Sequence, residues 1–598
     1  MQIYSDFLKN LLEKRGIIGS EQIEFFLNPN YERDLHDPFL MRDMEKVCKR
    51  IFQAINQDEK IIIYADYDCD GIPGAVILSD LFKKINYQNY EVYIPQRNSE
   101  GYGLNIEAIK KFAEKKIQLL ITIDLGITAV KETALANELG IDVIITDHHL
   151  PPEILPNAFA ILNPKIDNYP EKMLCGAGVM FKFTQGFLKK YGENFKIKNG
   201  AEKWFLDMAG IATLSDMVPL LGENRALAYF GLKVLRKSPR PGLQKLLTKT
   251  NINQKFLTED DLGFTITPRL NAASRMDNPQ RAFELLSTTN EIEADQLVEH
   301  LTKINDERKK IVINIMREVN KKFEDENRIL KEVIVIGNPN WKLGVLGLVA
   351  GKICEKYKKP VFVWSKDENS CIKGSCRSDG SISVVKLMNE VQECFMGYGG
   401  HEASGGFTVH NEQIHSLEEN LCKKFLELGL VAKQKSRFDL EGAQRSNLDF
   451  CLATKLDHYD LKINLNTVNM QNYSEIEKMG PFGLGNPKPI FLFEKIKIEK
   501  IKKFGKNNSQ EHLEIIFSEF SESKFSDKSD FSSTNKSDLQ KAYLQKTVKA
   551  ISFFYNPESF QKEITNESEG NSVNLLANFD LSLFGGKKEL RLKIIDIF

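Results

Sequence analysis

Four short apolar runs rich in β-branched residues alternate with helical stretches between about residues 60 and 220. The runs are Ile61–Tyr64, Tyr90–Ile94, Leu119–Ile123 and Val143–Thr146. A strand buried on both faces has a continuous apolar sequence, and alternation with helices is typical of βαβ units. The sequence therefore predicts an α/β domain around a mainly parallel sheet.

The remaining sequence must form further folded units, because 598 residues exceed what one hydrophobic core supports. Residues 290–326 contain no Gly or Pro, begin with Asn290 and Glu293 as a capping box, and repeat apolar residues at helical spacing. This pattern predicts a long helix between two lobes. The predicted divisions are an N-terminal extension (1–45), a first α/β domain (46–288), a connector helix (289–328), a second α/β domain (329–432) and a C-terminal β-barrel domain (433–598) with a flexible insert near 519–545.

Cysteine usage and charge limit the class of protein. Nine cysteines are scattered without a CxxC pair, which argues against zinc ribbons and disulfide frameworks and favours reduced thiols in the cytoplasm. Residues 1–16 carry both charge signs and no unbroken apolar core, so we expect neither a signal peptide nor a membrane span there. A net charge of −1 means that any nucleic acid would bind a local cluster of cations.

Acidic and histidine side chains follow apolar runs at four places. They are Asp66, Asp68 and Asp70 in DYDCDG, Asp124 in TIDLG, His148 and His149 in TDHH, and Asp216 in SDMVPL. The carboxyl ends of neighbouring parallel strands meet at one crevice, so these side chains are expected to converge. Asp66, Asp68 and Asp70 share one face if the backbone stays extended. Carboxylates this close repel one another unless a cation lies between them, and a carboxylate–imidazole set suits Mn²⁺ or Mg²⁺.

Each motif also has a less specific explanation. A single Asp after a strand is often a helix cap or a turn former, and paired histidines are often surface residues. The DYDCDG segment is similar to part of a calcium loop, but no Glu follows at EF-hand spacing and a strand precedes it. Four motifs in one βαβ context make a shared metal site the better explanation.

The ordered motifs DYDCDG, TIDLG, TDHH and SDMVPL resemble those of the DHH phosphoesterase superfamily. The resemblance implies two divalent cations, Mn²⁺ or Mg²⁺, with the metal ligands Asp68, Asp70, Asp124, His148 and Asp216. It implies two further catalytic residues: Asp66 as a ligand or supporting carboxylate, and His149 facing the scissile phosphate. Tyr64 stands where family II pyrophosphatases have a histidine ligand, so the first motif is of the exonuclease type.

Further stretches resemble the RecJ exonucleases within this superfamily. They are LLEKRGI (11–17), DPF (37–39), PQR (95–97), EGYGL (100–104) and PRLNAASRM (268–276). GGHEASGG (399–406) resembles the GGH motif of the DHH-associated domain, and the segment that carries PFGLGNPKP (481–489) resembles the OB-type barrel domain of RecJ proteins. The resemblance implies the substrate-binding residues Arg97, Tyr102, Asn271, Arg275, Ser375, Arg377, Gly400 and His401. Thr267 and Ser274 stand where the RecJ signature usually has glycine.

The segments KGSCRS (373–378) and 399–406, which carry four of these residues, have a chemical explanation of their own. Ser375 and Arg377 lie two residues apart on one side of an expected extended segment and can bind a terminal phosphate together. The glycine-rich segment 399–406 is expected to be a loop whose amides hold an anion, although an ordinary turn has the same composition. In the C-terminal domain Phe482 could stack on a base, but we expect it in the core.

The resemblance implies a metal-dependent exonuclease that degrades single-stranded DNA in the 5′ to 3′ direction to mononucleotides, in DNA repair and recombination. It implies a cytoplasmic monomer with no membrane partner, beside a helicase and a single-strand-binding protein. The two-lobe layout predicts a channel that excludes duplex DNA. An oligoribonucleotide or cyclic-dinucleotide phosphodiesterase is an alternative, disfavoured by the segment after residue 435. A non-catalytic DNA-binding relative is another, disfavoured by the intact ligand set.

Overall fold

The computed structural model describes residues 4–97, 100–166, 168–325, 330–435, 459–505, 511–519, 546–555, 560–582 and 588–598. The chain forms two compact units, residues 30–452 and residues 1–29 together with 453–598. The predicted insert at 519–545 lies, apart from its first residue, outside the described residues. No helix among the described residues is long and apolar enough to cross a membrane.

The predicted parallel sheet is present and has five strands in the order β2-β1-β3-β4-β5. All four strand pairs are parallel. The strands are β1 (Ile61–Ala65), β2 (Tyr90–Tyr93), β3 (Leu119–Ile123), β4 (Asp142–Thr146) and β5 (Ala160–Leu162). Strand β5 was not predicted, because its three residues are too short a run to stand out from a loop.

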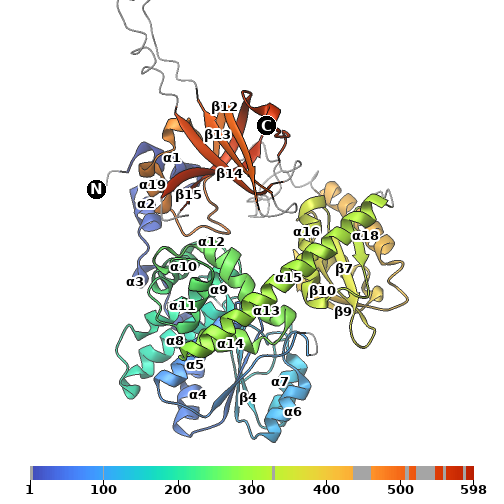
Figure 1. Cartoon of the computed structure of the whole chain (residues 1–598). Coiled ribbons are helices and arrows are strands. Elements are labelled where there is room, and N and C mark those ends of the chain that lie inside the picture. Colours follow the sequence, from blue (N-terminus) through green and yellow to red (C-terminus); the bar gives the residue numbers. More distant parts are fainter. Residues whose placement is uncertain are drawn as a thin grey trace, which may run out of the picture. The chain divides into compact units, whose positions relative to one another are not determined.

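Helices cover both faces of this sheet (Figure 1). The helices on one face are α4 (Met44–Asn56), α5 (Gly71–Lys84) and α8 (Gly176–Tyr191), and those on the other are α6 (Ile106–Glu114) and α7 (Val130–Glu138). Along β1, Ile61 and Ile63 pack on the first set, whereas Ile62 and Tyr64 pack on the second. Burial on both faces explains the continuous apolar runs and leaves the strand ends for the acidic motifs.

A helical layer follows the sheet and completes the first α/β domain. Its helices are α9 (Leu206–Ser215), α10 (Gly222–Leu235), α11 (Pro241–Lys249), α12 (Glu259–Asp261), α13 (Thr267–Met276) and α14 (Gln280–Ser287). The short helix α3 (Tyr31–Asp34) precedes the sheet and contacts α10. The buried ammonium of Lys182, 2.9 Å from the carboxylate of Glu223, ties α8 to α10.

The predicted connector helix is confirmed as α15, a single helix over Glu291–Asp325. The side chain of Asn290 accepts hydrogen bonds from the N–H groups of Ile292 and Glu293, at 2.9 and 3.2 Å. The Glu293 carboxylate instead accepts from the Thr288 hydroxyl, so only half of the predicted capping box forms.

The second α/β domain has a mixed sheet in the order β6-β7-β8-β10-β9, in which only β6 and β7 are parallel. Its strands are β6 (Ile334–Gly337), β7 (Val361–Lys366), β8 (Ile372–Arg377), β9 (Phe395–His401) and β10 (Ser404–Val409). Its helices are α16 (Leu346–Tyr357), α17 (Val384–Asn389) and α18 (Leu417–Lys435).

The C-terminal domain is built from strand pairings that run through β12, β13, β14, β16 and β15 and return to β12. Its elements are β11 (Leu461–Lys462), α19 (Met470–Glu477), β12 (Phe491–Phe504), β13 (Glu511–Ser518), β14 (Thr547–Tyr555), β15 (Ser572–Ser582) and β16 (Glu589–Ile597). Phe482 is 6% exposed and belongs to the core of this domain, as expected.

The first two helices, α1 (Asp6–Lys14) and α2 (Ser20–Leu27), pack on the C-terminal domain. This packing brings together residues 1–29 and residues 453–598, and no local sequence pattern predicts a contact over such a distance in the chain. Leu8, Leu11 and Leu12 are fully buried in the core of that domain. Arg15 donates to Asn486 Oδ1 and to the Pro487 carbonyl, both at 2.6 Å.

We predict that Arg15→Leu loosens α1 from the C-terminal domain. Hydrogen bonds from a charged group contribute about 2 kcal/mol, so the free energy of opening of α1 should fall by about that amount. Hydrogen exchange at the amides of α1 measures this opening. Lys9→Ala removes a more exposed cation, 3.7 Å from Asp6, and should leave the exchange unchanged. Equal exchange in both variants would contradict the role given to Arg15.

Candidate metal centre and substrate site

The acidic motifs meet beyond the carboxyl ends of three neighbouring strands. Asp66 follows β1, Asp124 follows β3, and His148 and His149 lie just after β4. Asp124 has a φ of 63°, in the left-handed region. This conformation is uncommon for a residue other than glycine and is typical of functional sites whose surroundings hold the backbone in place.

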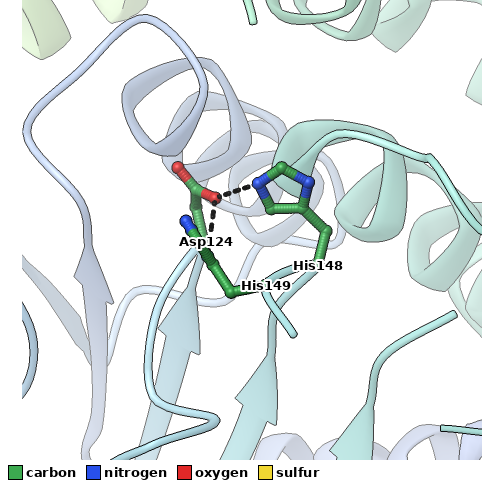
Figure 2. Close-up of side chains that lie close together, drawn as sticks. All are labelled: Asp124, His148 and His149. Carbon is green, nitrogen blue, oxygen red and sulfur yellow. Dashed lines mark ion pairs between the residues drawn. The ribbon is translucent and has the colours of Figure 1, made fainter. Parts of the chain in front are cut away.

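All seven predicted metal ligands and catalytic residues lie together. They form three groups in which the ligand atoms lie within 4.8 Å of one another: Asp124 with His148 and His149, Asp70 with His148 and Asp216, and Asp66 with Asp68 and Asp124. Figure 2 shows one oxygen of Asp124 between the two imidazoles, 3.1 Å from His148 Nε2 and 3.9 Å from His149 Nδ1. His148 Nε2 also lies 3.7 Å from Asp70 and 3.8 Å from Asp216.

The condition attached to the first motif is not met, and the apolar run before the fourth motif is not a strand. The backbone after β1 does not stay extended but turns, and Asp70 directly precedes α5 with φ −112° and ψ −55°. Asp70 therefore groups with His148 and Asp216 rather than with Asp66 and Asp68. Asp216 follows a helix, α9, and not a strand. Because α9 is almost wholly buried, its sequence lacks the polar face that distinguishes a helix from a buried strand.

The N-terminus of α8 holds the Asp70 carboxylate. The amides of Gly176 and Ala177 donate to its two oxygens at 2.6 and 2.7 Å. Free N–H groups and the helix dipole stabilise a carboxylate at this position. A Cβ on residue 176 would lie 2.5 Å from the Cβ of Asp124, so glycine is required for both carboxylates to fit.

Basic side chains offset only part of the charge of the cluster, with Arg97 acting on Asp66 and Lys165 on Asp216. Burial, and then repulsion from neighbouring carboxylates, raises the pKa of Asp66 and Asp124 well above the ordinary value. The same causes raise the pKa of Asp70 to about 7 and that of Asp216 to about 9. One buried oxygen of Asp66 and one of Asp124 accept no hydrogen bond from the described residues. Carboxylate oxygens and imidazole nitrogens this close together are suitable ligands for divalent cations. Bound cations would remove the repulsion between the carboxylates.

Asp147 of the third motif, TDHH, orients His149, a role that the sequence prediction did not assign to it. Its carboxylate lies 2.7 Å from His149 Nδ1, and it also accepts from the N–H of His148 at 2.7 Å and of Ile127 at 2.9 Å. Burial opposes protonation of His149, but the hydrogen bond and charge of Asp147 outweigh it and raise the pKa of His149. The TDHH motif itself carried the signal for Asp147, because a carboxylate that fixes an imidazole is a common arrangement.

Asn163 and Lys165 were also missed. The Asn163 amide donates to the His149 carbonyl at 2.9 Å, and the Lys165 ammonium donates to the His148 carbonyl. These contacts fix the main chain of both histidines. The residues follow β5, the strand that the sequence analysis did not find.

Two predicted substrate residues border the metal ligands. The hydroxyl of Tyr102 lies 3.4 Å from each ring nitrogen of His149, and the Tyr102 side chain is 53% exposed. The guanidinium of Arg97 lies 5.1 Å from the ring centre of Tyr67, the residue after Asp66. Both side chains therefore lie beside the cluster of carboxylates and imidazoles.

Ser375 and Arg377 lie on the same side of β8, as predicted. Both side chains lie next to Gly347 of α16. A Cβ built on this glycine would be 3.6 Å from the Ser375 hydroxyl and 3.1 Å from Arg377 Nη2. Arg275 in α13 donates to the Gly344 carbonyl at 3.3 Å, close to the start of the same helix. Burial, and then repulsion from Arg97 and other arginines including Arg377, lowers the pKa of Arg275 to about 9. Predicted residues of both lobes thus form a cationic cluster.

The glycine-rich segment 399–406 is not the loop that we expected. It forms the facing ends of the antiparallel strands β9 and β10, because short side chains let the strands approach closely. Gly400 has a φ of 146°, and a Cβ there would lie 2.3 Å from the Ser404 carbonyl oxygen. Ser404 in turn pairs with Arg377. The side chain of His401 is outside the described part of the chain, and Asn271 lies on α13 one turn before Arg275.

We predict that Asp124→Asn stabilises the metal-free protein, because it removes one charge from a repulsive cluster. In the wild type, Mn²⁺ at about 100 times its Kd should add about 2.7 kcal/mol to the free energy of unfolding. The variant should gain much less. Thermal unfolding with chelator and with Mn²⁺ measures both effects. Asp295→Asn, at an exposed aspartate 3.0 Å from Lys245, is the matched control and should behave as the wild type. An undiminished gain in Asp124→Asn would rule out this cluster as the cation site.

Comparisons with known proteins agree with this architecture. The sequence matches the DHH family, N-terminal domain, over residues 60–213, the DHHA1 domain over 329–427 and the RecJ OB domain over 459–596. It is 34% identical to the single-stranded-DNA-specific exonuclease RecJ of Bacillus subtilis (strain 168), covering 85% of this chain and 61% of that protein. It is 30% identical to the Haemophilus influenzae protein of the same name, covering 85% and 86%. The fold is similar to that of RecJ from Thermus thermophilus in complex with Mn²⁺, with a TM-score of 0.72 and 22% identity, covering 100% of this chain and 78% of that one.

Proposed function

This chain belongs to the RecJ family of single-stranded-DNA-specific exonucleases, and we propose that it hydrolyses single-stranded DNA from the 5′ end to mononucleotides. The observation that carries the proposal is the cluster of carboxylates and imidazoles beside a cluster of arginines contributed by both lobes. The first suits divalent cations and the second suits phosphates.

The metal ligands in this proposal are Asp68, Asp70, Asp124, His148 and Asp216, with Asp66 as a ligand or a supporting carboxylate. Divalent cations bound there would polarise the phosphodiester and supply a nucleophilic water at neutral pH. Either Mn²⁺ or Mg²⁺ suits these donors. Asp147 holds His149 Nδ1, and His149 Nε2, 3.4 Å from the Tyr102 hydroxyl, donates a proton to a non-bridging oxygen or to the leaving group.

The remaining predicted residues bind the strand in this proposal. Arg275, Ser375 and Arg377 anchor the 5′-terminal phosphate, with Asn271, Gly400 and His401 next to them in the chain or the sheet. Tyr102 and Arg97 hold the first nucleotide beside His149. We infer that selectivity for single strands is steric, with the strand passing between the catalytic domain (the first α/β domain) and the second α/β domain through a channel that a duplex cannot enter. The wider role is in DNA repair and recombination, as a cytoplasmic monomer working with a helicase and a single-strand-binding protein.

The test of this function is digestion of single-stranded DNA labelled at the 5′ or the 3′ end, with Mn²⁺. We expect the wild type to release the 5′ label first, as a mononucleotide, and to leave blunt duplex intact. Asp124→Ala should lower the rate about 1000-fold, because metal ions contribute several kcal/mol to stabilisation of the transition state. Asp295→Ala is the control. Earlier release of the 3′ label would reject the polarity, and activity only on short RNA or cyclic dinucleotides would favour the alternative phosphodiesterase.

Arg275→Gln tests the terminal anchor. The variant should raise KM about tenfold for a strand with a 5′ phosphate, because a charge-assisted hydrogen bond is lost. For a strand with a 5′ hydroxyl, KM should change little. Steady-state kinetics on the two substrates give the comparison. An equal rise in KM for both would show that Arg275 does not bind the terminal phosphate.

A further inference from the structure

The apolar stripe of α15 is interrupted at the point where the helix passes from one lobe to the other. Leu297, Leu301 and Ile304 pack in the core of the catalytic domain, and Val312 begins the stripe that packs with the second domain. At helical spacing, the positions between them on this inner face are Asn305 and Arg308. Two polar residues thus replace apolar ones where a continuous stripe would be most stable.

The polar atoms at this interruption are buried without partners. Asn305 is 0% exposed, and among the described residues neither its Nδ2 nor its Oδ1 has a hydrogen-bond partner. The same holds for Nε of Arg308 and, on the facing helix α13, for Nε of Arg269 and Oδ1 of Asn271. Buried polar groups are rarely left unpaired, because each costs about 1–3 kcal/mol. A ligand with several acceptor oxygens would satisfy the unpaired donors.

The charge at the interruption selects an anion. Arg308 is half-buried, and its neighbours include Arg269 and Arg275, while the acidic neighbour Asp306 is exposed on α15. Guanidinium groups repel one another in the absence of a ligand and bind phosphate oxygens strongly when one is present. A cation would be repelled. The unpaired oxygen of Asn271 can bond to an ordered water beside the ligand.

We propose that Asn305 and Arg308 of the connector helix, with Arg269 of α13, form a subsite for a backbone phosphate of the DNA strand. The proposal rests on the proposed function, since it takes single-stranded DNA as the substrate. The subsite lies beside the anchor of the terminal phosphate through Arg275, which follows Arg269 on the same helix. A strand bound there contacts the helix that joins the two lobes, as well as the catalytic domain.

Arg308→Gln is the first variant to test, with a short 5′-phosphorylated oligothymidylate, Mn²⁺ and NaCl between about 50 and 200 mM. We expect KM to rise about tenfold with kcat unchanged. The plot of log(kcat/KM) against log salt should become shallower by about 0.7, the slope expected for one phosphate contact with a single strand. Arg308→Lys should keep the slope. Arg317→Gln is the matched control, because Arg317 is an exposed arginine on the same helix, and it should change neither quantity.

Asn305→Leu separates ligand binding from a structural role. Leucine continues the apolar stripe, so the free protein should unfold at the same or a higher temperature while KM rises. A lower unfolding temperature with unchanged KM would mean that Asn305 only supports the fold, and it would overturn the proposal. An Arg308→Gln variant with the same KM and salt dependence as Arg317→Gln would also overturn the proposal.

The two failures can be told apart. If the wild type degrades no single-stranded DNA, both the proposed function and the subsite are wrong. If the wild type is active but the Arg308 and Asn305 variants leave KM and the salt dependence unchanged, only the subsite is wrong.

Discussion

Repulsion among the buried carboxylates is the constraint on which the rest of the structure depends. Asp66, Asp70 and Asp124 are nearly inaccessible to solvent, and their neighbours of like charge include Asp68 and Asp216. Arg97 and Lys165 offset only part of this repulsion, so a rigid scaffold has to hold the carboxylates together. The parallel sheet meets this requirement, because it places the ends of β1, β3 and β4 side by side with both faces packed.

The scaffold also orients the individual groups. Backbone N–H groups at the start of α8 hold Asp70, and the glycine at position 176 lets Asp124 approach the same helix. Asp147 fixes His149, and Asn163 fixes the main chain that carries both histidines. Each of these contacts is made by buried or part-buried groups rather than by a flexible surface side chain. Preorganisation of this kind is what catalysis of phosphodiester hydrolysis by electrostatics demands.

The near-zero net charge conceals two opposite local fields. The carboxylates gather at the strand ends, while Arg97, Arg275 and Arg377 gather next to them from both lobes. A single DNA strand can bind to both clusters at once, with one phosphate among the arginines and a neighbouring phosphate over the carboxylates and their cations. The connector helix α15 contacts elements of both lobes and is therefore a structural part of this arrangement, not only a spacer.

The sequence by itself determined the parallel sheet and the connector helix, and it marked the acidic and histidine side chains that gather at the strand ends. These follow from local signals: continuous apolar runs, helical periodicity without Gly or Pro, and acidic residues directly after strands. Only the tertiary structure decided that Asp216 follows a helix, that Asp70 groups with His148 and Asp216, and that the GGH segment is paired in a sheet. It also decided that residues 1–29 pack on a domain encoded after residue 453. The physical reason is that buried helices and buried strands have similar apolar compositions, so the sequence does not distinguish them. Contacts between segments far apart in the chain also produce no periodic pattern in the sequence of either segment.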